Sequence, residues 1–325
     1  MSVEHNIVSV SGGKDSTALL LLAIERHTEN LSAVFADTGH EHAQTYEYVR
    51  YLNENVFPIR TIKADFSRQI AAKAAFISEK WREQGIAEEK VMRALEVMKP
   101  TGNPFLDLCI WKGRFPSTKA RFCSEELKRN PIIAQVQRPL LEAGDDVVSW
   151  QGVRADESES RRGLPERECK EVDGNTGAEL WNYRPILKWT VDEVFAMHRK
   201  HGIRPNPLYQ QGMGRVGCMP CIHARKDELL EIGMRFPEEI DRVAAWEIIV
   251  GEASKRDMAT FFATAQLAGP QQTSDSADIS LATHGVWQAI EWAKTSRGGR
   301  QYDIFRSEGE QEGVSLCTSI YGLCE

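Results

Sequence analysis

The chain has 325 residues, of which 42% are hydrophobic and 27% are charged, a composition typical of globular proteins and not of disordered ones. Its formal net charge of −7 argues against a protein coated with positive charge for non-specific nucleic-acid binding, although a local basic surface is compatible with it. No apolar run approaches the roughly 20 residues that span a bilayer, and the N-terminus lacks a basic start followed by an apolar core. We therefore expect a cytoplasmic protein without a membrane partner.

Short β-rich runs alternate with helical runs in the first part of the chain. The first strand ends at a Ser-Gly-Gly turn, and Asp15 or Ser16 can cap the helix that follows. The expected strands cover residues 6–10, 31–36 and 59–62, and the expected helices cover residues 17–26 and 44–55. This alternation at this spacing indicates an α/β fold with a doubly wound, mostly parallel sheet.

The pattern loosens after the third strand. A charged, helical composition indicates a helical insertion over about residues 68–120, and the chain is again mostly helical in character after Cys221. Later elements are expected at 147–153 (a strand), 173–177 (a turn) and 190–200 (a helix that a capping box opens). We expect a first domain over residues 1–235 and a helical C-terminal region with a cysteine-containing tail over residues 236–325, although no linker marks the boundary.

A phosphate-binding layout is expected at the turn after the first strand, Ser11-Gly12-Gly13-Lys14-Asp15-Ser16. Glycines let the backbone approach phosphate oxygens, and the helix N-terminus adds partial positive charge. Lys14 adds a full charge, and the serine hydroxyls donate further hydrogen bonds. The spacing is neither that of the P-loop of kinases and GTPases nor Gly-x-Gly-x-x-Gly. The alternative is an ordinary glycine-rich turn with a capping aspartate, but that interpretation does not account for the strand before the turn and the buried helix after it.

The same segment resembles the PP-loop of the N-type ATP pyrophosphatases, the adenine nucleotide alpha hydrolase-like superfamily, which cleave ATP between its α and β phosphates. Asp37-Thr38-Gly39-His40-Glu41 resembles a segment of one branch, the phosphoadenosine phosphosulfate (PAPS) reductase-like family. Further segments that resemble this family follow in its order at residues 121–128, 152–158, 185–190, 206–209 and 217–221. Together the motifs are highly specific for the family and only weakly specific for the reaction.

The resemblance implies roles for the matching residues. The implied nucleotide-binding residues are Ser11, Gly12, Gly13, Lys14, Asp15, Ser16, Asp37, Thr38, Lys128, Arg154 and Arg161. Lys14, Asp15 and Arg154 are the implied catalytic residues, with Lys14 neutralising charge in the transition state. Arginine forks match phosphate or sulfate oxygens, which suits Arg154 and Arg161 to anion binding. A helix-capping Asp37 and a solvated surface Lys128 are the alternatives.

Seven cysteines in a chain of this kind favour metal-binding or catalytic roles over disulfides. Cys218 and Cys221 form a Cys-x-x-Cys, and the resemblance places Cys123 at the upstream cysteine position of the family. Relatives with a [4Fe–4S] cluster have a cysteine pair there, and Phe122 replaces one partner, so Cys109 is the expected fourth ligand. A three-cysteine cluster is the alternative. Thiolates would accept an iron–sulfur cluster or zinc, and a protein without metal or with a redox pair stays open.

Two further segments leave alternatives open. The tail holds Cys317 and Cys324 in an order that differs from the Glu-Cys-Gly-Leu-His tail of the sulfonucleotide reductases, so the resemblance assigns no nucleophile there. A tail thiol that reaches the active site stays open. Residues 112–129 carry six basic and two acidic side chains. That run fits either a solvated helix face or anion binding.

We therefore expect an enzyme that binds ATP with Mg2+, cleaves the α–β bond and adenylylates or activates an acceptor, in sulfur transfer with an iron–sulfur cluster. The complete loop with Lys14 favours a triphosphate, because the reductases of the family often lose this pattern. The alternatives are reduction of PAPS or adenosine phosphosulfate to sulfite, and a non-catalytic nucleotide-binding subunit. The acceptor, which could be a tRNA base, DNA or a small metabolite, and assembly into a homo-oligomer stay open.

Overall fold

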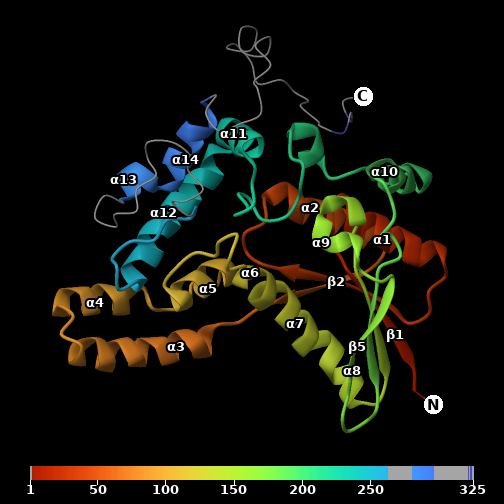
Figure 1. Cartoon of the computed structure of the whole chain (residues 1–325), viewed down its shortest axis with the longest axis horizontal. Helices are drawn as coiled ribbons and strands as arrows, with labels where there is room; N and C mark the ends of the chain where they lie inside the picture. Colours follow the sequence, from red (N-terminus) through yellow and green to blue (C-terminus); the bar gives the residue numbers. More distant parts are fainter. Residues whose placement is uncertain (1, 263–279, 296–320, 322, 324–325) are drawn as a thin grey trace.

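A six-stranded sheet in the order β3-β2-β1-β4-β6-β5 forms the centre of the protein, in a computed structural model that describes residues 2–262, 280–295, 321 and 323 (Figure 1). The strands are β1 (Glu4–Ser9), β2 (Leu31–Asp37), β3 (Ile59–Lys63), β4 (Asp146–Trp150), β5 (Arg167–Val172) and β6 (Glu179–Tyr183). All neighbouring strands are parallel except β5 and β6, which are antiparallel. The predicted mostly parallel α/β fold is confirmed.

Helices cover both faces of the sheet, which explains why the central strands are apolar at consecutive positions. Val8 and Val148 belong to a core on one face, and their neighbours Ile7 and Val147 belong to a core on the other. The first face carries α1 (Lys14–Glu25), α2 (Ala43–Asn55) and α10 (Val191–Lys200), and the second carries α7 (Asn130–Ile132), η3 (Ile133–Gln137) and α8 (Arg138–Glu142). The result is a three-layer arrangement.

A second group of helices shares a core of its own beside the sheet, at the left of Figure 1. From the predicted insertion it takes α3 (Ser67–Phe76), η1 (Ile77–Trp81), α4 (Glu88–Val97) and α5 (Pro104–Lys112), and from the C-terminal region α11 (Lys226–Arg235), α12 (Pro237–Ala253) and α14 (Val286–Ala293). The short α13 (Leu281–His284) precedes α14. The boundary expected near residue 235 falls inside this core, which holds both Ile232 and Val243. Among the described residues, no helix has the length and apolar character to cross a bilayer.

The carboxyl ends of β1 and β4 define where a ligand can bind. The chain continues from β1 to β2 on one side and places β4 on the other, so the strand order reverses between β1 and β4. In open α/β sheets the crevice at such a switch point is the usual ligand site. Short segments then close this end: α6 (Phe122–Ser124), η2 (Glu125–Arg129), η4 (Ala155–Glu157), α9 (Glu159–Arg162) and η5 (Pro207–Gln211).

Candidate functional site

The turn between β1 and α1 has the backbone that its glycines predict. Gly12 has a φ of +75°, and a Cβ added there would lie 3.0 Å from the Thr45 side chain, so the turn requires glycine. The Ser16 hydroxyl donates to the Gly13 carbonyl at 3.0 Å and accepts the Ser11 N–H at 3.1 Å. These bonds hold the turn in shape at the N-terminus of α1.

Lys14 is a buried cation at this turn, with an exposed fraction of 4%. Its Nζ lies 3.3 Å from the Asp15 carboxylate, 5.3 Å from the centre of the Tyr209 ring and 5.0 Å from the centre of the Tyr321 ring. Its backbone N–H donates to the Tyr209 hydroxyl at 2.9 Å, and its carbonyl lies 3.0 Å from Nε2 of buried His198. A desolvated ammonium at a helix N-terminus suits the binding of a phosphate.

The arginine expected to bind an anion is held by carboxylates. Arg154 is buried, and it donates from Nε to Asp15 at 2.5 Å and from Nη1 to Asp156 at 2.6 Å. Arg161 on α9 pairs with Glu157. The structure therefore brings Lys14, Asp15 and Arg154 together in one chain of ion pairs, in which Asp15 lies between the two cations.

Asp37 organises the segment that follows β2. Its carboxylate accepts the Gly39 N–H at 2.9 Å and the Tyr46 hydroxyl at 2.7 Å, and it pairs with Lys63 at 2.8 Å. Burial opposes ionisation of Asp37, but the hydrogen bonds from Lys63 and Tyr46 outweigh it and lower the pKa of the carboxyl below its ordinary value. The adjacent Thr38 is fully buried and donates to Glu41 at 2.7 Å.

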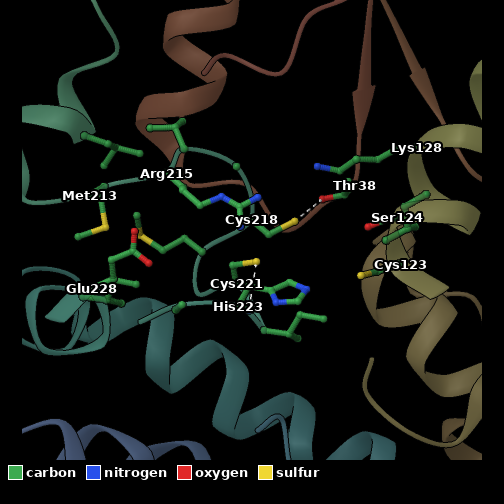
Figure 2. Close-up of a pocket in the computed structure, with 18 residues that line it drawn as sticks. Thr38, Cys123, Ser124, Lys128, Met213, Arg215, Cys218, Cys221, His223 and Glu228 are labelled. Carbon is green, nitrogen blue, oxygen red and sulfur yellow. Dashed lines mark hydrogen bonds between the residues drawn. The ribbon is translucent and has the colours of Figure 1, made fainter. Parts of the chain in front are cut away.

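A pocket next to this segment collects three of the predicted cysteines. Cys123, Cys218 and Cys221 line it together with Thr38 and Lys128 (Figure 2). The Cys218 sulfur lies 3.6 Å from the Thr38 hydroxyl, and burial raises the pKa of the Cys218 thiol to about 12. In Figure 2, Cys218 and Cys221 lie on one wall and Cys123 lies on the wall formed by α6 and η2. Residues far apart in the chain thus present thiols to one space.

The thiols in this arrangement do not form a four-ligand metal site. Within residues 2–262 and 280–295, no three His, Cys, Asp or Glu side chains are grouped so that they could hold a metal ion. Cys109, the expected fourth ligand, is fully buried in the helical core and does not line the pocket, although its thiol is near enough to Cys123 to be affected by its charge. Cys317 and Cys324 lie outside the described residues.

His40 joins the segment after β2 to the cysteine loop. Its carbonyl accepts the Met219 N–H at 2.8 Å, and its Nε2 lies 2.9 Å from the Pro220 carbonyl. Because that contact requires Nε2–H, Nδ1 is the acceptor for Arg242 of α12 at 3.2 Å. Burial lowers the pKa of His40 well below its ordinary value, which agrees with the neutral ring that this pattern needs. Arg242 also donates to the Met219 carbonyl at 3.0 Å.

The contacts of His40 and Arg242 escaped the sequence analysis for a physical reason. His40 lies inside a recognised segment, but a lone histidine beside a loop has no local pattern that distinguishes a clamp from a core residue. Arg242 lies 202 positions further along the chain, on a helix to which no role was assigned. Arg215, which lines the pocket beside Cys218, carried a signal that could have found it, because it stands two positions before the Gly-Cys-x-x-Cys segment.

Comparison with known proteins is consistent with this geometry. The sequence profile of the phosphoadenosine phosphosulfate reductase domain matches residues 5–224. A 37.8 kDa protein from the gpa 5′ region of Escherichia phage 186 is 50% identical over 331 residues, which cover 98% of this chain and 96% of that protein. The adenosine 5′-phosphosulfate reductase of Allochromatium vinosum is 37% identical over 87 residues, 26% of this chain and 32% of the reductase. A crystal structure of phosphoadenylyl-sulfate reductase from Candida auris covers 66% of this chain and 81% of its own, with 19% identity and a TM-score of 0.37.

Proposed function

The chain belongs to the phosphoadenosine phosphosulfate reductase domain family, and we propose that it uses the nucleotide loop to cleave ATP between the α and β phosphates and to activate an acceptor. An acceptor oxygen attacks the α-phosphorus, the bond from that phosphorus to the bridging oxygen breaks, and pyrophosphate leaves. The acceptor then carries the adenylyl group. The proton of the acceptor passes to solvent or to the departing pyrophosphate.

The observation that carries the proposal is the position of Lys14. Its ammonium is buried at the N-terminus of α1, and the Asp15 carboxylate lies 3.3 Å from it. A preorganised cation at this point stabilises the negative charge that develops as pyrophosphate leaves, and it acts strongly because water is largely excluded. Arg154 holds Asp15 from its other side at 2.5 Å, so the ion-pair chain orients the loop. Mg2+ would enter with the triphosphate and neutralise part of its charge.

The cysteine pocket supports an extension of the proposal to sulfur transfer. Thr38 follows Asp37 directly at the carboxyl end of β2, and its hydroxyl lies 3.6 Å from the Cys218 sulfur. An acceptor activated at the nucleotide loop would therefore lie near a wall of thiols. We propose that a persulfide-carrying donor transfers its outer sulfur to one of these thiols, and that the resulting persulfide attacks the activated carbon of the acceptor, whose bond to the adenylyl oxygen breaks so that AMP leaves. A second thiol then attacks the cysteine sulfur of the mixed disulfide, which leaves a cysteine disulfide and a thiolated acceptor, whether or not an iron–sulfur cluster takes part. Iron, sulfide and zinc content of protein purified without oxygen would settle that last point.

The test is the release of pyrophosphate from ATP and magnesium. Lys14→Met removes the charge but keeps the length of the side chain, and we expect the rate to fall about 10²- to 10³-fold, as when one charge-stabilising group is lost. Lys170→Met on the edge strand β5 is the matched control, because Lys170 is exposed and distant from the loop in sequence and sheet order. Thermal unfolding of both variants checks that they fold. Pyrophosphate release that is absent, or that Lys14→Met leaves unchanged, would refute ATP cleavage at this loop.

Sulfonucleotide reduction is a second candidate, which the position of the tail favours. The Tyr321 hydroxyl donates to the Gly214 carbonyl at 2.7 Å, and the Leu323 carbonyl accepts from Gln210 at 2.9 Å, so these two tail residues lie beside the loop that carries Lys14. A cysteine thiolate would attack the sulfur of PAPS or adenosine phosphosulfate, the nucleotide would leave, and a second thiol would release sulfite. Sulfite formed with a thiol donor, without pyrophosphate formed from ATP, would favour this reaction.

A further inference from the structure

Two exposed arginines, one lining the cysteine pocket and the other directly before a helix that lines it, have no acidic partner among the described residues. Arg215 lines the pocket, and its guanidinium points toward Cys218 in Figure 2. Arg121 directly precedes α6, which contributes Cys123 to the opposite wall. Neither arginine side chain forms an ion pair or hydrogen bond with any described residue. In this they differ from Arg154 and Arg161, whose carboxylate partners compensate their charge.

The positive charges of these arginine side chains affect one another, and the arginines lie along the chain of sites from the nucleotide loop to the cysteine pocket. Burial lowers the pKa of Arg161, and the charges of Arg215, Arg154 and Arg121 lower it further. Like charges gathered around one pocket repel one another, and an anion bound among them relieves that repulsion. The free cations therefore form a site for an oxyanion, and guanidinium groups bind phosphate in this geometry.

The segment that leads into Arg121 adds basic and aromatic side chains. Arg114 and Lys119 are exposed, and the Arg114 guanidinium lies 5.6 Å from the centre of the Phe122 ring. Lys112 lies 3.7 Å from the centre of the Trp111 ring, although it also pairs with Glu126. Exposed cations beside aromatic rings are typical of surfaces that bind single-stranded nucleic acid, where phosphates meet the cations and bases stack.

We propose that Arg121 and Arg215, with Arg114 and Lys119 beside them, bind the phosphate backbone of a single-stranded nucleic acid and direct it into the cysteine pocket. A strand is favoured over a duplex, because an atom inside a stacked duplex does not reach a pocket wall. This inference rests on the proposed function in one respect, because it identifies the single strand as the acceptor that ATP activates. Binding of the strand does not require ATP cleavage, so the two can fail separately.

The experiment measures fluorescence anisotropy of a labelled single-stranded oligonucleotide, as DNA and as RNA, with the full chain and no nucleotide. We expect affinity to fall as salt rises, so the slope of log affinity against log salt is negative. Arg121→Gln and Arg215→Gln should each reduce the steepness of that slope by about 0.7, the contribution of one phosphate contact. Each variant should weaken binding roughly tenfold, as when a charged hydrogen bond is lost. Lys170→Gln, on exposed β5, is the control and should bind like the original chain.

Three results would overturn the proposal. The first is that neither oligonucleotide binds at low salt, and the second is that the Arg121→Gln/Arg215→Gln double variant binds as tightly as the original chain. The third is that inorganic phosphate or sulfate binds in calorimetry, with loss in the double variant, while the oligonucleotides do not. That result would assign the arginines to a small oxyanion. Urea unfolding of the double variant, expected to match the original chain because both side chains are exposed, excludes a folding defect.

Discussion

Replacing His40 by phenylalanine tests whether one buried side chain holds the cysteine loop against the segment after β2. The change keeps an aromatic ring against Phe105, whose ring centre lies 4.3 Å away. It removes the Nε2–H near the Pro220 carbonyl and the Nδ1 acceptor for Arg242, which retains its bond to the Met219 carbonyl. The perturbation therefore removes two hydrogen bonds and almost no apolar contact.

The cost of the change can be worked from these two bonds. Leaving the buried Pro220 carbonyl without a donor costs about 1–3 kcal/mol, and losing the bond from a charged guanidinium costs about 1.5–3 kcal/mol. We therefore expect the free energy of unfolding to fall by roughly 2.5–6 kcal/mol, a large part of the total of about 5–15 kcal/mol for a typical domain. The assay is urea unfolding at neutral pH. His5→Phe is the control, because the ring of partly exposed His5 pairs with Asp145 at the surface, and the loss of such a pair should cost about 1 kcal/mol or less.

A second readout separates a clamp from an ordinary core residue. Alkylation of each cysteine, followed by mass spectrometry under native conditions, should show faster modification of Cys218 in His40→Phe, with exposed Cys169 as the internal reference. The reason is that the bridge between Glu41 and Cys218 loses its neighbouring support. A loss of stability below about 1 kcal/mol, or a large loss with unchanged alkylation of Cys218, would refute the role of His40 as a clamp of the cysteine loop.

Three other changes have expected outcomes. Gly12→Ala forces a positive φ on alanine and places its Cβ 3.0 Å from Thr45, so thermal unfolding should show a loss of about 1–2 kcal/mol or more. Burial raises the pKa of Glu247 to about 7, so the folded state binds the Glu247 proton more tightly than the unfolded state does. The stabilisation of the folded state by this proton is complete below the pKa of the unfolded state and is lost as pH rises through 7. The stability of the original chain relative to Glu247→Gln should therefore decrease by roughly 3 kcal/mol between pH 4 and pH 8 in urea titrations, and parallel pH profiles would exclude Glu247 as the titrating group. Tyr321→Ala removes a ring 5.0 Å from the Lys14 ammonium, so calorimetry should show nucleotide binding tightened by up to about thirtyfold, whereas weaker binding would show that the tail adds to the nucleotide site.

The fold could be predicted from the sequence where the apolar pattern of a segment matches its burial between the layers of the structure. The consecutive apolar residues of β1 and the glycine turn at Gly12 identify a parallel strand that feeds a helix. The hairpin of β5 and β6 was missed except for its turn, because β5 is an edge strand with mostly exposed side chains and shows no apolar alternation. The expected strand at 147–153 ends earlier, at Trp150, because the chain then turns so that Gly152 packs against the backbone of Asp15.

The residue types of the candidate site could be predicted from the sequence, but which of the predicted residues are buried in the core could not. Lys14 and the Cys-x-x-Cys pair stand in segments whose chemistry can be read locally. Cys109 illustrates the limit, because a cysteine can be a ligand or a small apolar side chain, and sequence separation from Cys123 decides nothing. A signal was present: α5 is apolar on nearly all sides, with Phe105 and Ile110 buried beside Cys109, which is typical of a core helix.

The segment after β2 gives the nucleotide loop and the cysteine pocket a common support. Asp37 ends the strand, Thr38 contacts the Cys218 sulfur, and His40 binds the cysteine loop through backbone and side chain. His40 is fully buried among the rings of Phe105, Trp246 and Phe261, so its bonds to the cysteine loop lie in a packed environment. Arg242 completes the support from α12, beyond the 5–224 span of the family domain. Through Arg242 the helical C-terminal region contacts the loop that carries Cys218 and Cys221, and the same region shares a core with the inserted helices.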